Sequence, residues 1–327
     1  MTKIALVTGG AGFIGSHMVD NLIGKGLQVR VVDNLSTGRL DNLKHISTAD
    51  LEVDTRDLND IESDDSIFKG VDYVFHFAGI GDIVPSIEDP MKYMDANVMA
   101  TVRLLEGARS AGISRFVYAA SSSCYGLAKV PTTESDAITP EYPYALSKYQ
   151  GEQAVLHWQK VYGLGANSIR MFNVYGTRSK TNGAYGAVMG VFLKQKLEGK
   201  PFTVVGDGEQ RRDFVYVTDV AEAFFQVAKS KVSGHVYNVG ADKPQSINRL
   251  VELLGGPVTH LPKRPGEPET TWANISKISS EIGWTPQISF EDGVGKILEN
   301  IDYWQEAPLW TPDSIAEATK TWFHSLS

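Results

Sequence analysis

Short apolar segments alternate with helix-forming segments over the first half of the chain. Five apolar segments begin near residues 3, 28, 51, 71 and 115, and they are apolar at consecutive positions rather than at every second one. Strands of this kind are buried on both faces, as in parallel sheets that are covered by helices. Apolar positions at helical spacing, closed by a glycine, follow the first strand. The pattern therefore predicts an α/β fold with a doubly wound parallel sheet.

The pattern of apolar and polar residues changes after about residue 178. Glycine, proline and charged residues interrupt the regular alternation, and the apolar runs near residues 202 and 235 are shorter. We expect residues 1–177 to form the doubly wound (Rossmann) domain, with part of 213–245 returning to it. Residues 178–327 then form mainly a smaller, mixed domain.

Composition limits the classes of partner. The chain has 327 residues with 42% hydrophobic and 21% charged residues, which is typical of a globular protein. Its net charge of −8 argues against a broad nucleic-acid surface. No apolar run is long enough to span a membrane, and residues 1–10 lack the long apolar core expected of a signal peptide. A single cysteine cannot form an intramolecular disulfide, so we expect a cytoplasmic protein with no membrane partner.

A glycine-rich turn follows the first strand directly and opens the first helix. Gly9, Gly12 and Gly15 stand at three-residue spacing, and Asp33 ends the next strand. Glycines let the backbone approach a pyrophosphate, while an acid at the second strand accepts ribose hydroxyls and repels a 2′-phosphate. This pattern predicts NAD rather than NADP, unless Asp33 merely caps a loop. Asp57, after the third strand, is placed either near an adenine or as a helix N-cap.

Two Tyr-x-x-x-Lys pairs occur, and the spacing alone does not choose between them. Tyr144 and Lys148 lie in a stretch that is typical of a helix, whereas Gly126 interrupts the pair Tyr125 and Lys129. Residues four apart on a helix project from one face, so a continuous helix would bring the first pair together.

The chain as a whole resembles the extended short-chain dehydrogenase/reductase family, and within it the nucleotide-sugar epimerases and dehydratases. The residues that carry the resemblance span nearly the whole chain, in order: TGGAGFIG, VFHFAG, SIEDPMKYMDANV, SSSCYG, YPYALSKYQGE, RMFNVYGTR, GDGEQRRDFVYVTDV and YNVG.

The resemblance implies that Tyr144 and Lys148 are catalytic, together with Ser121. Tyr144 takes the proton of a sugar hydroxyl, Lys148 binds the nicotinamide ribose, and Ser121 binds the reacting hydroxyl. Tyr125 matches a structural tyrosine of the family. A free tyrosine has a pKa near 10, so neighbours must lower it by roughly three units, or ~4 kcal/mol. The Lys148 ammonium and the cationic nicotinamide favour the anion.

The resemblance also assigns binding residues at both ends of the site. For NAD they are Gly9, Gly12, Phe13, Ile14, Gly15, Asp33, Asn34, Asp57, Leu58, Phe77, Ala78, Gly79, Asn97, Tyr144 and Lys148. For a nucleotide-diphosphate sugar they are Ser122, Ser123, Asn173, Arg212, Arg264, Glu267 and Thr271, where the arginines bind phosphate. For Ser122 and Ser123, a purely structural role is expected as much as a binding role. Arg178 and Arg211 stay unassigned. No metal site is expected.

The serine stretch separates the reactions of the family. Dehydratases carry an acidic pair after the catalytic residue, and elimination of water needs such groups, whereas this chain has Ser122 and Ser123. The resemblance therefore implies a 4-epimerase of the UDP-glucose/UDP-N-acetylglucosamine type. The alternatives are a 4-dehydrogenase that releases a keto hexose or heptose on UDP or GDP, and a dinucleotide-sensing scaffold.

Some segments depart from the well-known epimerases. MFNVYGTR replaces the usual Tyr-Phe-Asn-Pro, Asn274 replaces an aspartate, and residues 307–327 extend beyond the usual family end. Thr271 stands where a small residue admits N-acetyl sugars, although it could instead face solvent. The helices around 92–111 and 142–162 resemble those that form a homodimer in this family.

Overall fold

The computed structural model describes residues 2–179 and 188–325. Its centre is a seven-stranded parallel sheet in the order β11-β6-β5-β4-β1-β2-β3. The strands are β1 (Ile4–Thr8), β2 (Gln28–Val32), β3 (Leu51–Asp54), β4 (Tyr73–His76), β5 (Arg115–Ser121), β6 (Ala166–Met171) and β11 (Val236–Val239). The predicted doubly wound parallel sheet is thus confirmed.

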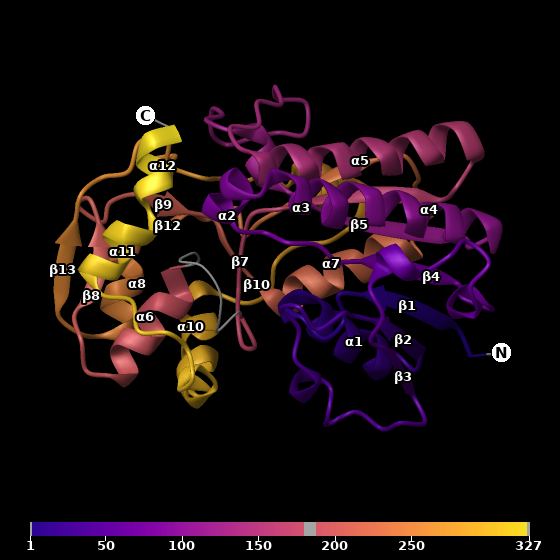
Figure 1. Ribbon diagram of the computed structural model, residues 1–327, viewed down its shortest axis with the longest axis horizontal. Helices are drawn as coiled ribbons and strands as arrows, with labels where there is room; N and C mark the ends of the chain where they lie inside the picture. Colours follow the sequence, from indigo (N-terminus) through magenta and orange to yellow (C-terminus); the bar gives the residue numbers. More distant parts are fainter. Residues whose placement is uncertain (1, 180–187, 326–327) are drawn as a thin grey trace.

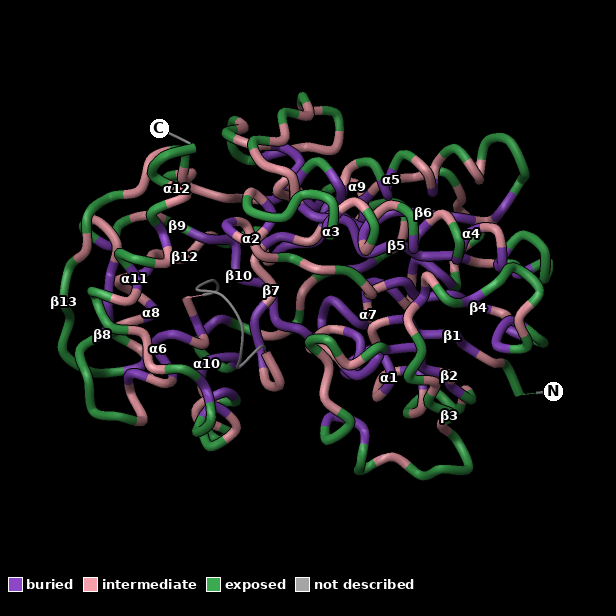
Figure 2. Tube along the Cα trace, viewed as in Figure 1, coloured by how far each residue is buried: buried purple, intermediate pink, exposed green. Residues whose placement is uncertain are grey.

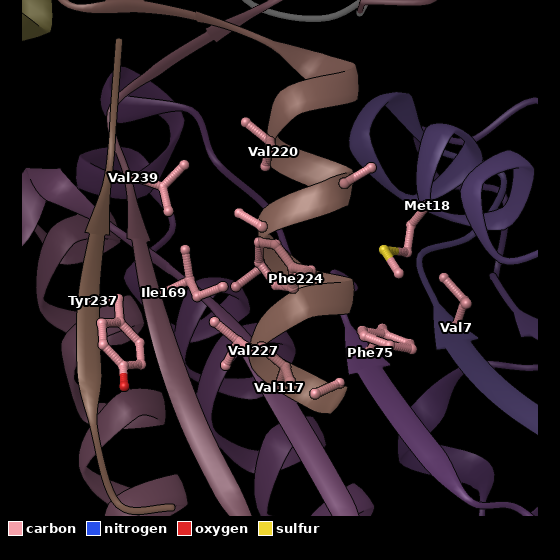
Figure 3. Packing of buried hydrophobic residues seen from close by; sticks show 14 of the residues in the cluster. Val7, Met18, Phe75, Val117, Ile169, Val220, Phe224, Val227, Tyr237 and Val239 are labelled. Carbon is pink, nitrogen blue, oxygen red and sulfur yellow. The ribbon is translucent and has the colours of Figure 1, made fainter. Parts of the chain in front are cut away.

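Helices cover both faces of this sheet, and β5 shows why its sequence is apolar at consecutive positions. Val117 and Ala119 belong to the core on one face, whereas Phe116 and Tyr118 belong to the core on the other. Helices α1 (Phe13–Gly24) and α7 (Val217–Lys229) cover the first face, and α4 (Ala100–Ser110) and α5 (Pro143–Tyr162) cover the second. Figure 3 shows Phe224 of α7 among strand residues of the first core.

Both ends of the long helix α5 follow from its sequence. Pro143 occupies the first turn, where its missing N–H costs nothing, and the residue before it is extended. Gly163 ends the helix in the left-handed conformation, with φ of 71°. A shorter run of helix precedes α4, formed by α2 (Ile83–Glu88), α3 (Pro90–Met94) and the π-helical turn η4 (Asp95–Met99).

A second region has a core of its own, built by residues after 174. It contains three two-stranded sheets, which pair β10 with β7, β12 with β9, and β13 with β8. Their bounds are β7 (Asn173–Tyr175), β8 (Phe202–Val205), β9 (Arg211–Arg212), β10 (Phe214–Tyr216), β12 (Gln245–Ser246) and β13 (Val258–Leu261). Its helices are α6 (Val188–Leu197), α8 (Ile247–Leu254), α10 (Phe290–Leu298), α11 (Pro312–Ala318) and α12 (Lys320–Ser325), while α9 (Ser276–Ile282) packs on β11.

Figure 1 places this second region beside the carboxyl ends of the sheet strands. Figure 2 shows that the sheet itself is buried, whereas β13 runs along the outside of the second region and is largely exposed. Within residues 213–245, α7 covers the main sheet and β11 is its edge strand. A division of the chain at residue 177 stays a prediction.

Candidate active site

A cavity of about 460 Å³ lies at the carboxyl ends of the central strands. Such a position, where the strand order reverses, is where open α/β sheets bind their ligands. All but one of the residues assigned to the cofactor line it: Gly9, Gly12, Phe13, Ile14, Gly15, Asp33, Asn34, Asp57, Leu58, Phe77, Ala78, Gly79, Tyr144 and Lys148. The exception is Asn97.

The glycine turn leaves no room for side chains. Gly9 has φ of +68°, and a Cβ there would lie 2.7 Å from the amide nitrogen of Ala78. A Cβ on Gly15 would lie 2.0 Å from the carbonyl oxygen of Gly9. Gly12 is the N-cap of α1 and has no side chain to occupy the first amides of the helix. These amides and the positive end of α1 therefore suit a pyrophosphate.

Asp33 is held in place by the backbone around it. Its carboxylate accepts hydrogen bonds from the amides of Ala11 and Leu35, each at 2.9 Å. Burial raises the pKa of Asp33, while these amides oppose the shift. The remaining lone pairs can accept ribose hydroxyls, so the cavity fits NAD, and a 2′-phosphate would meet a carboxylate.

Asp57 is a helix N-cap, and its predicted contact with an adenine stays a prediction. Its side chain caps the 3₁₀ turn η2 (Leu58–Asp60) by accepting from the amide of Asn59. It also accepts a hydrogen bond of 2.6 Å from the side-chain amide of Asn34, and it lines the cavity. The cap and the predicted adenine contact therefore do not compete.

The side chain of Asn97 does not line the cavity, but it hydrogen-bonds the backbone of Ile80, which does. Its side chain donates to the carbonyl of Ile80 at 3.0 Å and accepts from the amide of the same residue at 2.9 Å. It also bonds Ser147 of α5 and is fully buried. Asn97 therefore holds the turn at 79–81 in place, and its predicted role in binding the cofactor stays a prediction.

Tyr144 and Lys148 lie one turn apart on α5, and the same turn at 79–81 covers both. A Cβ on Gly81 would lie 3.7 Å from the Tyr144 hydroxyl, and one on Gly79 would lie 3.8 Å from the Lys148 Nζ. Ser121 ends β5, lines the cavity with them and hydrogen-bonds Tyr144. The three residues assigned to catalysis are therefore together.

The protein's own groups do not lower the pKa of Tyr144. Burial raises it, and the hydrogen bond with Ser121 only partly opposes this. Burial also lowers the pKa of Lys148 to about 7, against the attraction of Glu152. Burial disfavours the charged form of Lys148, and the expectation that its ammonium helps Tyr144 to form a phenolate stays a prediction. A cationic nicotinamide would supply further positive charge.

A second cavity of about 580 Å³ adjoins the first and shares Tyr144 with it. Five of the residues that were assigned to a sugar nucleotide line this cavity, namely Asn173, Arg212, Arg264, Glu267 and Ser123. Ser122 lines neither cavity. Thr271, which was also assigned to the substrate, lines neither cavity. Its hydroxyl donates to the Asn173 Oδ1 at 2.6 Å and accepts a hydrogen bond from the amide of Asp213.

Glu267 lies between the two arginines. Its carboxylate pairs with Arg212 at 2.7 Å and with Arg264 at 3.8 Å. The side chains of both arginines are about one-tenth exposed, so their charges are weakly screened. The cluster keeps one net positive charge and presents guanidinium groups to the cavity, which suits a diphosphate.

Several lining residues carried no signal in the sequence. Tyr303 lines the first cavity, and Trp310 and Trp322 line the second, although all three come from the last 25 residues. Of the unassigned arginines, Arg178 lines the first cavity and pairs with Asp20 at 2.8 Å. Arg211 is exposed on β9.

Over residues 2–179 and 188–325, no cluster of three or more acidic, histidine or cysteine side chains is arranged to hold a metal ion. In the same part of the chain, no helix has the length and apolar character needed to cross a membrane.

Comparison with known proteins gives consistent matches. The family model for the NAD dependent epimerase/dehydratase family matches residues 5–240. A putative UDP-glucose 4-epimerase of Methanocaldococcus jannaschii is 36% identical over 302 residues, covering 90% of this chain and 96% of the relative.

Two solved structures add the fold and its ligands. The UDP-N-acetylglucosamine 4-epimerase of Methanobrevibacter ruminantium, in complex with UDP-N-acetylmuramic acid, superposes with a TM-score of 0.85 at 34% identity, covering 91% of this chain and 99% of that one. The UDP-glucuronic acid 4-epimerase of Bacillus cereus, in complex with UDP-glucuronic acid and NAD, gives 0.83 at 29% identity, covering 93% and 99%. The chain belongs to the NAD dependent epimerase/dehydratase family, and its cofactor is NAD.

Proposed function

We propose that this protein is a UDP-sugar 4-epimerase that acts on UDP-glucose or UDP-N-acetylglucosamine. The observation that carries the proposal is the position of Tyr144 at the junction of the two cavities. On one side lies the NAD cavity, and on the other lies a cavity that contains Arg212, Arg264 and Glu267. A sugar linked to a diphosphate on those arginines would reach Tyr144 with its reacting carbon.

The residues then divide the chemistry among them. Tyr144, which hydrogen-bonds Ser121, would take the proton of the 4-hydroxyl, and Ser121 would bind the oxygen of that hydroxyl. The chemistry that NAD supplies is reversible acceptance of a hydride from carbon 4. Tyr144 would then return the proton to the oxygen on carbon 4, so the net reaction would be inversion at carbon 4 without oxidation. Ser122 and Ser123 provide no carboxylate for elimination.

A product analysis tests this proposal. The purified protein is incubated with a panel of UDP-, GDP- and dTDP-sugars, and the products are followed by NMR together with NADH absorbance. We expect the 4-epimer of a UDP-sugar and no lasting rise of NADH. Stoichiometric NADH with a 4-keto sugar would identify a 4-dehydrogenase instead. Absence of turnover with every sugar, by protein that binds NAD, would leave only the dinucleotide-sensing scaffold.

We further propose a cytoplasmic homodimer. Helices α4 and α5 lie side by side on one outer face of the protein (Figure 1), and Met99, Leu146 and Val161 expose apolar surface beside or on them. Such surface is what a helical dimer interface buries. The buried single cysteine fits a reducing compartment. Sedimentation velocity would measure the oligomeric state.

A further inference from the structure

The C-terminal segment follows the cleft between the two regions of the protein. Tyr303 lines the NAD cavity and donates a hydrogen bond of 3.2 Å to Asn42. Further along, Ala307, Pro308, Trp310, Thr319 and Trp322 line the second cavity. Residues 307–327 are the segment expected from the sequence to extend beyond the usual end of the family.

Helix α12 connects the two walls of the second cavity. Thr321 donates a hydrogen bond of 3.1 Å to Glu88, the last residue of α2, on the Rossmann side. On the other side, the indole N–H of Trp322 donates to the carbonyl of Pro265 at 2.8 Å. The helix therefore fixes the loop that carries Arg264 and Glu267 relative to α2.

Trp322 also contacts Arg264 directly. The guanidinium carbon of Arg264 lies 5.8 Å from the centre of the indole ring, within the range of a cation–π contact. Arg264 is thus bounded by the indole on one side and by Glu267 on another. An arginine whose rotamer is already fixed loses less conformational entropy when it binds a phosphate.

We propose that α12 is part of the nucleotide site and that Trp322 is the positioning residue that holds Arg264 toward the diphosphate. The inference rests on the proposed function for the identity of the ligand. Trp322 should therefore affect the affinity for the diphosphate, because its indole positions Arg264 and the loop that carries it. Trp322 should have no effect on the proton transfer at Tyr144.

The experiment uses the full-length protein loaded with NAD and compares Trp322→Ala with Trp322→Phe. Affinity for UDP is measured by calorimetry, with uridine as the phosphate-free control. We expect Trp322→Ala to weaken UDP binding and raise KM on the order of tenfold, with kcat and NAD content unchanged. Trp322→Phe keeps a ring but loses the N–H, so its effect should be about two- to threefold. Affinity for uridine should not change.

Trp158 provides a matched control. Its indole N–H also makes one hydrogen bond, to Glu106 at 2.6 Å, and it lines neither cavity. Trp158→Phe should leave UDP affinity unchanged. A double variant then separates positioning from direct contact with the base. If Trp322 acts through Arg264, adding Trp322→Ala to Arg264→Met should weaken UDP binding little further. Additive losses, or an equal loss for uridine, would overturn the inference.

Hydrogen exchange separates this inference from the proposed function. The four amides between Pro262 and Pro268, those of Lys263, Arg264, Gly266 and Glu267, should exchange faster in Trp322→Ala than in the wild type with no nucleotide present, because the Pro265 contact is lost. Unchanged exchange would refute the positioning role, whatever sugar the enzyme uses. A wild type that binds no UDP and turns over no UDP-sugar would refute the proposed function, while the exchange result would still decide the role of Trp322.

Discussion

Tyr144–Lys148 and Tyr125–Lys129 have the same spacing in the sequence but lie in opposite surroundings. The first pair stands on one continuous helix, so the two side chains share a face and reach the same cavity. In the second pair, Tyr125 ends the turn η5 (Ser122–Tyr125), and Gly126 follows with φ of +59°. The backbone between the second tyrosine and its lysine is not helical, so no shared face exists.

The partners of the two pairs differ as well. Tyr125 is buried, donates to Asn238 at 2.7 Å and accepts from Arg170 at 2.8 Å, so all its polar capacity is used by the protein. Lys129 has a side chain 81% exposed. Tyr144 instead faces a cavity, and Lys148 is buried with no carboxylate of the described residues within ion-pair distance of it. The hydroxyl of a catalytic tyrosine therefore stays available to a ligand, whereas the hydroxyl of a structural tyrosine forms its hydrogen bonds within the protein.

The largest difference between the pairs should appear in turnover. Tyr144→Phe removes the group that exchanges a proton with the sugar, and we expect turnover to fall by roughly 10²-fold or more. Tyr125→Phe should leave turnover within a few-fold at temperatures where the protein is folded. Both are measured with whichever sugar the product analysis identifies. Wild-type activity in Tyr144→Phe would refute the mechanism.

The lysines should differ next, by a smaller factor. We expect Lys148→Met to lower turnover about tenfold or more and to move the optimum of the pH–rate profile upward, because the phenolate loses a nearby cation. Lys129→Met should change neither quantity, since that lysine lies in solvent and pairs only with Asp136 at 3.7 Å. A profile that does not move in Lys148→Met would remove Lys148 from its assigned role.

Local sequence predicted those features that the backbone itself decides. The close approach of Gly15 to Gly9, the bond from the Leu35 amide to Asp33 and the two ends of the helix from Pro143 to Gly163 each depend on neighbours close in sequence. The apolar runs also predicted a sheet that is buried on both faces.

The spacing of residues in the sequence did not predict the contacts between segments that are distant along the chain. Nothing local to Asn97 shows that its amide would hold the turn at Ile80, and nothing local to Thr271 shows that it would bond Asn173. The position of Glu267 between two arginines, and that of Trp322 on Arg264, also depend on how loops from different parts of the chain meet. Such details follow from tertiary packing alone.

For stability we expect the opposite order, with a larger effect from Tyr125→Phe than from Tyr144→Phe. Tyr125→Phe leaves the buried Asn238 oxygen without its donor and removes an acceptor from Arg170, and we expect unfolding free energy to fall by about 2 kcal/mol. Tyr144→Phe should change it by less than about 1 kcal/mol, because that hydroxyl faces a cavity. Chemical denaturation of both variants measures the difference. Equal stabilities would contradict the structural role of Tyr125.

The smallest expected effect concerns the pH dependence of stability in protein freed of NAD. Burial lowers the pKa of Lys148 to about 7, whereas an unfolded lysine titrates at 10.5. Between these values the unfolded chain holds a proton that the folded chain has released, so stability rises with pH in this window. The gain from this one group is about 1 kcal/mol between pH 7 and 8.

Lys148→Met should lack this gain, while Lys129→Met should keep it, since that lysine is exposed in the folded protein. His76, next to Lys148, does not confound the comparison, because burial holds its pKa well below 6.5 and it stays neutral throughout the window. Glu152 pairs with Arg170 at 2.6 Å and is present in every variant. Denaturation of the three proteins at pH 7 and pH 8 measures the contrast. An identical pH dependence in wild type and Lys148→Met would show that the ammonium of Lys148 is better solvated or better paired than its burial implies.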